Sequence, residues 1–311
     1  MMLQSLLFIL IALLASASAQ AEEMRVVASI RPLHSLVAAV MDGVGSPGLL
    51  VEGVASPHGY QLKPSQRRML GQADVIFYVD EKFETFLAHA LPSLPASAQT
   101  VALAQTAEIP LLPLRAGGVW EKHSHPHEHG HEQEDEPGGR DYHIWLNPRF
   151  ARMMVQQIAA VLAARDPAHA DRYTANALRF ETDLAALDEE LATMLSGVAE
   201  RPFIVFHDGL QYVETRYGLQ GVGSITLHPE LPPSAARLVA IRDKIRNGGA
   251  VCVFSEPQFS PRVMETVTEG TNVRRAVVDY LGYDLATGKD HYARMMRHLA
   301  SAIATCLAPS S

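Results

Sequence analysis

This sequence of 311 residues has little cysteine and no run of lysine and arginine. Two cysteines are too few for the framework of several bridges that holds small secreted domains together. The formal net charge is −8, and no run of lysine and arginine offers the basic footprint that nucleic-acid binding requires. The composition therefore excludes a disulfide-held mini-protein, and we expect no nucleic-acid partner.

Charged side chains are missing from residues 1–21. This segment holds a mostly apolar stretch at residues 3–14 and then small residues, with Ala-x-Ala patterns that end at Ala19 and Ala21. The pattern is typical of a secretory signal peptide, and the alternative is a buried helix of the mature fold. The stretch is shorter than the roughly 20 residues that span a bilayer, and neither an acylation cysteine nor a second long apolar run follows it. We expect a soluble periplasmic protein that does not span the membrane.

Short apolar runs alternate with helix-like segments in both halves of the chain. Hydrophobic residues make up 48% of the sequence, which suits a globular protein of one large or two ordinary domains. The alternation is typical of βα units that build a mostly parallel sheet. The expected strands are residues 25–30, 49–54 and 75–79 in the first half, and 203–206, 220–225, 251–254 and 273–278 in the second.

About thirty residues without glycine or proline separate the two halves. Asp166 and Pro167 mark the start and Gly197 the end of one expected helix, about 45 Å long. We predict an α/β fold of two lobes, each with a mostly parallel sheet and surrounding helices, joined by this long helix; a plain helix of one core is the alternative. The expected parts are a signal peptide at 1–21, an N-terminal lobe at 22–165, the linker helix at 166–197 and a C-terminal lobe at 198–311.

One stretch, residues 121–141, breaks the pattern. It carries seven acidic residues against two basic ones, and it has no apolar periodicity. We expect a disordered loop inside the N-terminal lobe. The alternating histidines can bind metal weakly near the main site, and a solvated spacer is the alternative. These histidines are His123, His125, His127, His129 and His131.

Isolated histidines follow several of the expected strands. His58 comes after the run 49–54 and His207 directly after 203–206, while Asp279 follows 273–278 in the same way. His143 lies in the separate segment 141–145. In open α/β sheets ligands bind at the carboxyl ends of strands, and three imidazoles with one carboxylate suit tetrahedral Zn²⁺. Each histidine alone also fits an ordinary structural role.

Four segments resemble the zinc-uptake substrate-binding proteins of ABC transporters, the cluster A-I (ZnuA-like) family. The resemblance extends over nearly the whole mature chain, in the order that the family shows. The segments are GVASPHGYQLKPS at 53–65, DYHIWLNP at 141–148, VFHDGL at 205–210, and FSEPQF at 254–259 together with VDYLG at 278–282.

This resemblance implies that His58, His143 and His207 are metal ligands, and that Asp279 stands where several relatives have a fourth. A histidine rather than a carboxylate at the third position favours Zn²⁺ over manganese. Pro57 and Gly59 stand where relatives carry acidic residues, which leaves three candidates for the fourth ligand. These are Asp279, a water molecule and a histidine from the mobile loop.

Two further pairs of residues are assigned by the resemblance or by position. Relatives with a pair such as Cys252 and Cys306 bridge them, so we expect a disulfide; two buried thiols or a soft metal site are the alternatives. Glu256 and Asp208 lie beside the expected site. Each can orient a ligand histidine or serve an ordinary structural role.

The resemblance implies a non-enzymatic function. We expect a monomer that captures Zn²⁺ between the lobes and delivers it to an ABC transporter permease in the inner membrane. A manganese- or iron-binding member of the same family is the first alternative. An exported zinc hydrolase is less favoured because no His-Glu-x-x-His motif lies on an expected helix; the match at residues 127–131 falls in the expected disordered loop. A surface protein that uses its histidines for adhesion or metal storage conflicts with the α/β pattern along the whole chain.

Overall fold

The computed structural model describes residues 24–105, 109–115, 139–226 and 229–309. The expected signal peptide and the five clustered histidines, His123 to His131, lie outside these residues. No helix in the described part of the chain is both long and apolar enough to cross a membrane.

The first half of the chain forms a parallel sheet with the strand order β2-β1-β3-β4. All four residues of β3 are apolar and buried, as expected for a parallel strand covered on both faces. The strands 25–30, 49–54 and 75–79 were expected, whereas β4 was not. The elements are β1 (Val26–Ala28), α2 (Arg31–Val40), β2 (Gly48–Leu49), α3 (Pro64–Gln72), β3 (Val75–Tyr78), α4 (Thr85–Ala88) and β4 (Gln99–Ala102), with short 3₁₀ turns at Leu91–Ser93 and Leu103–Gln105.

The second sheet repeats this topology, with the parallel order β6-β5-β7-β8. In each sheet the chain starts at an inner strand, moves to one side and then crosses to the other. In folds of this kind ligands bind at the carboxyl ends of the strands beside the crossing, here β5 and β7. The elements are β5 (Phe203–His207), α7 (Gln211–Tyr217), β6 (Gly221–Thr226), α8 (Ala235–Arg246), β7 (Cys252–Ser255), α9 (Pro261–Thr268), β8 (Arg274–Val277) and α10 (His291–Leu307).

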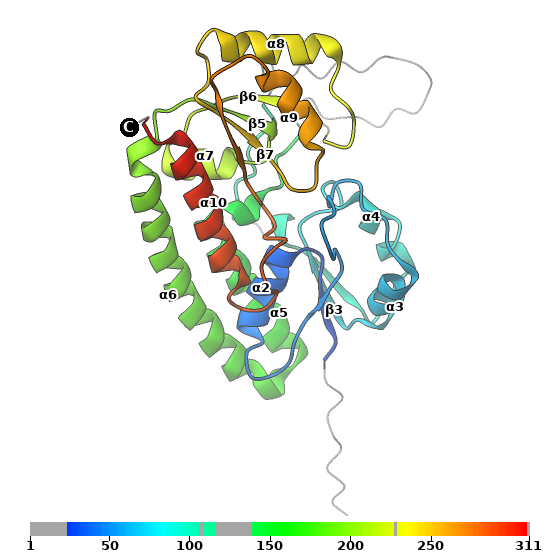
Figure 1. The fold of residues 1–311 in the computed structure, drawn as a ribbon. Helices are drawn as coiled ribbons and strands as arrows, with labels where there is room; N and C mark the ends of the chain where they lie inside the picture. The colour runs from blue at the N-terminus through cyan, green and yellow to red at the C-terminus, as the bar shows by residue number, and fades with distance from the viewer. Residues whose placement is uncertain (1–23, 106–108, 116–138, 227–228, 310–311) are drawn as a thin grey trace, which may run out of the picture.

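Two consecutive helices, α5 (Pro148–Arg165) and α6 (Ala170–Leu195), connect the sheets. The 26-residue helix α6 has a 3₁₀ turn at each end, Pro167–His169 and Ser196–Val198, so the expected linker is present with tighter ends. In Figure 1, α6 runs along one side of the molecule from the lower to the upper lobe. The predicted fold class is confirmed. The limits 22–165 and 198–311 stay a prediction, because α10 packs against α2 and α6 as well as β8.

The two lobes share one hydrophobic core. Buried residues from both sheets, among them Phe77 of β3 and Phe254 of β7, belong to a single cluster with α2, α5, α6 and α10. Two smaller clusters cover the outer faces of the sheets. Separation of the lobes would expose part of this continuous core, at about 25 cal/mol for each Å² of apolar surface. The helices therefore form a stiff frame that holds the two lobes together.

A disulfide bond joins Cys252 of β7 to Cys306 of α10. It ties the last helix to the second sheet across 54 residues of sequence. The predicted pairing is confirmed.

Candidate metal centre

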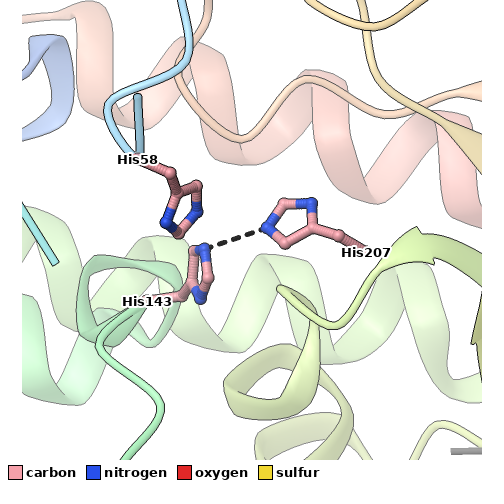
Figure 2. Close-up of side chains that lie close together, drawn as sticks. All are labelled: His58, His143 and His207. Atoms are coloured by element: carbon pink, nitrogen blue, oxygen red, sulfur yellow. Dashed lines mark hydrogen bonds between the residues drawn. The ribbon is translucent and has the colours of Figure 1, made fainter. Parts of the chain in front are cut away.

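Three histidines from distant parts of the sequence lie close together in space. His58 lies in the loop between β2 and α3, His143 precedes the 3₁₀ turn Ile144–Leu146, and His207 is the last residue of β5. Each offers a ring nitrogen, and the three nitrogens lie within 4.8 Å of one another. Figure 2 shows the three rings turned toward a common point. A single ion can therefore contact all three side chains.

Local structure fixes the position of each histidine. The five residues of β5 are all buried, so the strand holds His207 rigidly at its carboxyl end. The loop of His58 is fixed through backbone contacts, since Ser56 accepts a hydrogen bond from the His58 N–H and Thr85 donates one to the His58 carbonyl. His58 is the most exposed of the three, whereas the other two are buried. The side of the site that carries His58 is therefore the more open one.

Buried carboxylates hold the outer nitrogens of two of the histidines. The Nδ1 atom of His143 lies 2.7 Å from Oδ1 of Asp141, and Nδ1 of His207 lies 2.5 Å from Oε1 of Glu256. A proton on Nδ1 completes each of these hydrogen bonds, which leaves the Nε2 lone pairs for a ligand. The two Nε2 atoms face each other at 3.2 Å. This is the arrangement of histidine ligands that bind a metal through Nε2.

Charge near the site acts on the protonation of His207. Burial alone would lower its pKa, but the charge of Glu256 and its hydrogen bond raise the pKa above the usual value. Glu256 is itself 2% exposed and accepts a second hydrogen bond from Gln258. Protons therefore compete with a cation for His207 once the solution becomes acidic.

Aromatic rings enclose the three imidazoles. Phe83 contacts the rings of His58 and His143 edge-on, with centroid distances of 4.7 and 5.3 Å. The ring of Tyr280 packs against the ring of His207. A side chain on Gly209 would collide with the Tyr280 ring. This apolar wall excludes water from the buried side of the site and strengthens electrostatic contacts inside it.

Asp279 is not part of the three-histidine group. Its Oδ1 accepts hydrogen bonds from the backbone N–H groups of Leu281 and Gly282, and its Oδ2 accepts one from Tyr283. The carboxylate also lines a cavity between β8 and α10. In this conformation Asp279 stabilises the turn after β8.

The remaining acidic residues divide between two roles. Glu256 contacts a histidine of the group, as one of its two expected roles requires, whereas Asp208 forms an ion pair with Arg115. Asp141 was missed by sequence reasoning, although an Asp-x-His pattern signals it. One carboxylate oxygen accepts both the backbone N–H and the ring nitrogen of His143, two residues further on.

Comparison with known proteins assigns the family. A family model described as "Zinc-uptake complex component A periplasmic" matches residues 26–306. The chain belongs to this ZnuA family. The zinc-uptake proteins named ZnuA from Brucella abortus (strain 2308) and Paracoccus denitrificans (strain Pd 1222) are 41% identical over 304 residues and 37% identical over 311 residues. The alignments cover 91% and 94% of both partners, respectively.

Solved structures of the family have the same fold. A crystal structure of ZnuA superposes with a TM-score of 0.75 at 25% identity, covering 92% of this chain and all of that one. A zinc-bound ZnuA deletion mutant superposes with a TM-score of 0.74 at 25% identity, covering 93% of this chain and all of that one. The expected family is therefore confirmed along nearly the whole chain.

Proposed function

We propose that this protein captures Zn²⁺ with His58, His143 and His207 and delivers it to the permease of an ABC transporter. The observation that carries the proposal is the convergence of three ring nitrogens within 4.8 Å. Family membership supports the transport role, because the family is that of the periplasmic component of zinc uptake. Its relatives bear the name of high-affinity zinc uptake proteins.

The donor set favours Zn²⁺ over manganese or iron. Imidazole nitrogen suits zinc, whereas manganese prefers carboxylate and other oxygen ligands. In the conformation described, the carboxylates nearest the group, Asp141 and Glu256, bind the outer nitrogens of the histidines. Asp279 is engaged by three backbone N–H groups. We therefore expect a water molecule as the fourth ligand, since Asp279 can take that place only in a state where the turn after β8 opens.

The same contacts argue against an exported zinc hydrolase. Such an enzyme needs a general base within hydrogen-bond reach of the metal-bound water. Asp141 and Glu256 instead each accept a hydrogen bond from the far side of an imidazole. Both carboxylates orient ligands, which serves tight binding and not proton transfer.

Release of the ion follows from loop movement within a stiff frame. The core that both lobes share resists a wide opening. The three histidines, by contrast, lie in a loop, before a short turn and at the end of a strand. Docking of this monomer on the permease displaces these segments, and His58 on the open side is the first ligand to leave.

The proposal is tested by zinc uptake in cells. A bacterial strain without its own zinc-binding component is supplied with the cognate permease and either this protein or a variant with His58, His143 and His207 replaced by alanine. The unchanged protein should appear in the periplasmic fraction and restore uptake of radioactive zinc at limiting concentration. Equal uptake with the triple variant would refute the proposal.

A further inference from the structure

Two short segments, residues 111–115 and 139–141, run side by side and are called here the neck. Pro113 and Arg140 form an antiparallel bridge. On either side of it, Leu114 N–H donates to the Gly139 carbonyl and Asp141 N–H donates to the Leu112 carbonyl, each at 2.8 Å. Residues 116–138, which link the two segments in sequence, lie outside the described part. The neck leads directly into Asp141, the hydrogen-bond partner of His143.

The neck rests on helix α7. The Tyr212 hydroxyl donates to the Asp141 carbonyl at 2.7 Å and accepts from the N–H of Leu112 at 3.1 Å. The Gln211 side chain donates to the Pro113 carbonyl at 3.0 Å. Helix α7 starts four residues after His207. The neck and α7 therefore join the segment that carries His143 to the segment that carries His207.

Arg115 ties the end of the neck to Asp208 and to α7 through two ion pairs. Its guanidinium donates through Nε and Nη2 to Asp208, which follows His207, and through Nη1 and Nη2 to Glu214 of α7, at 2.6 and 2.9 Å. The Asp208 and Glu214 side chains are only 5% and 7% exposed. Bidentate pairs of this kind fix geometry as well as charge.

We propose that Arg115 is a positioning residue for zinc: it locks the neck to Asp208 and α7 and so holds His143 and His207 at the spacing that one ion requires. The inference rests on the proposed zinc-binding function. Arg115 reaches the ligands through other residues, since Asp208 adjoins His207 and the neck continues through Asp141 to His143. His58 lies in the loop between β2 and α3 and outside this unit.

Loss of Arg115 would leave two buried carboxylates beside each other. Burial already raises the pKa of Glu214, and the charge of Asp208 acts in the same direction, whereas Arg115 opposes both effects. Without the guanidinium the two carboxylates repel and are poorly solvated, so the segment after β5 must move away from α7. A shift of the residue after His207 changes the direction of its Nε2 lone pair.

The test compares substitutions at two similar ion pairs. Arg115→Met removes the guanidinium, and Arg115→Lys keeps the charge but loses the fork. The matched control is Arg216→Met, because Arg216 also pairs with a buried carboxylate, Asp188, at 2.6 to 3.1 Å. For each full-length variant we would measure zinc affinity by competition with a chromogenic chelator, the visible spectrum of the cobalt-loaded protein and the melting temperature without metal.

We expect both Arg115 variants to weaken zinc binding about tenfold to a hundredfold, as loss of contacts behind a metal ligand does. The cobalt spectrum should also change, because it reports ligand geometry. Arg216→Met should lower the melting temperature but leave the zinc affinity and the spectrum as they are. Equal zinc affinities for the Arg115 and Arg216 variants would overturn the inference.

A combined variant separates positioning from charge balance. Adding Asp208→Asn and Glu214→Gln to Arg115→Met removes the repulsion and should restore the melting temperature, while zinc affinity stays weakened. Recovery of full zinc affinity would show that Arg115 only neutralises charge, and would contradict the inference. The unchanged protein separates this failure from a wider one. If it binds zinc weakly, the proposed function fails, whereas tight binding that survives loss of Arg115 contradicts only the positioning role.

Discussion

The hydrogen bond between His207 and Glu256 makes the sharpest single prediction. Glu256→Gln keeps the size of the side chain but removes its charge. In the unchanged protein Oε1 of Glu256 lies 2.5 Å from Nδ1 of His207, and Oε2 accepts from Gln258. The amide oxygen of the glutamine accepts a weaker hydrogen bond from Nδ1 of His207. The amide NH2 group of the glutamine also comes close to the NH2 group of Gln258, which is itself a donor. The imidazole is then both less basic toward the metal and less firmly oriented.

The expected loss of affinity follows from this burial. Hydrogen bonds to buried charged groups contribute about 1.5 to 3 kcal/mol, and tenfold in a dissociation constant corresponds to about 1.4 kcal/mol. We therefore expect Glu256→Gln to weaken zinc binding roughly tenfold to a hundredfold near pH 8, the range found for groups behind metal ligands. Glu265→Gln, an exposed change on α9 of the same lobe, should leave the affinity unchanged.

The dependence on pH distinguishes this effect from a packing defect. Glu256 raises the pKa of His207, so in the unchanged protein protons compete with zinc from a higher pH. The glutamine variant lowers that pKa, and its affinity should fall later on acidification. The deficit measured by chelator competition should thus be largest near pH 8 and shrink toward pH 5. An unchanged affinity at pH 8, or a deficit constant with pH, would refute the reasoning.

Three other outcomes are expected. Replacing Cys252 and Cys306 by serine should lower the free energy of unfolding, measured by urea titration, by about 4 kcal/mol, while zinc affinity stays unchanged. The figure comes from the chain-entropy model for a loop of 54 residues. An unchanged urea midpoint would contradict this. The buried Glu84 has its pKa raised from 4.5 to about 8, so the native state keeps a proton that the unfolded state releases. Stability should therefore fall as the pH rises from about 4.5 to 8, and Glu84→Gln should flatten that slope; an equal slope in both proteins would exclude Glu84 as its source. Solution scattering should give the same radius of gyration with and without zinc, because the lobes share a core; a large change would mean that they open widely.

The sequence predicted the three histidines because each follows or adjoins a recognisable segment. His207 ends the apolar strand β5, and parallel sheets bind ligands at the carboxyl ends of their strands. The distances between the rings depend on how the two lobes pack, which periodicity does not reveal. The resemblance to a known family indicated that the three histidines bind the same ion.

The acidic residues show the limit of such reasoning. His207 is the last residue of β5 and Asp279 comes two residues after the end of β8, yet the carboxylate of Asp279 accepts three backbone N–H groups of its own turn. A carboxylate after a strand can cap a turn or bind a metal, and the two roles look alike in sequence. Asp208 and Glu256 likewise look alike in sequence, although Asp208 pairs with Arg115 and Glu256 with His207. Arg115 is far from Asp208 along the chain. Long-range pairs of this kind need coordinates.

The central claim is that three imidazoles from separate segments bind one zinc ion. X-ray absorption spectroscopy of the protein loaded with one equivalent of zinc tests it most directly. We predict three histidine nitrogens at about 2.0 to 2.1 Å and one oxygen ligand, with one imidazole fewer in each of the His58→Ala, His143→Ala and His207→Ala variants. A spectrum with one imidazole or none, or one that none of these substitutions alters, would contradict the account.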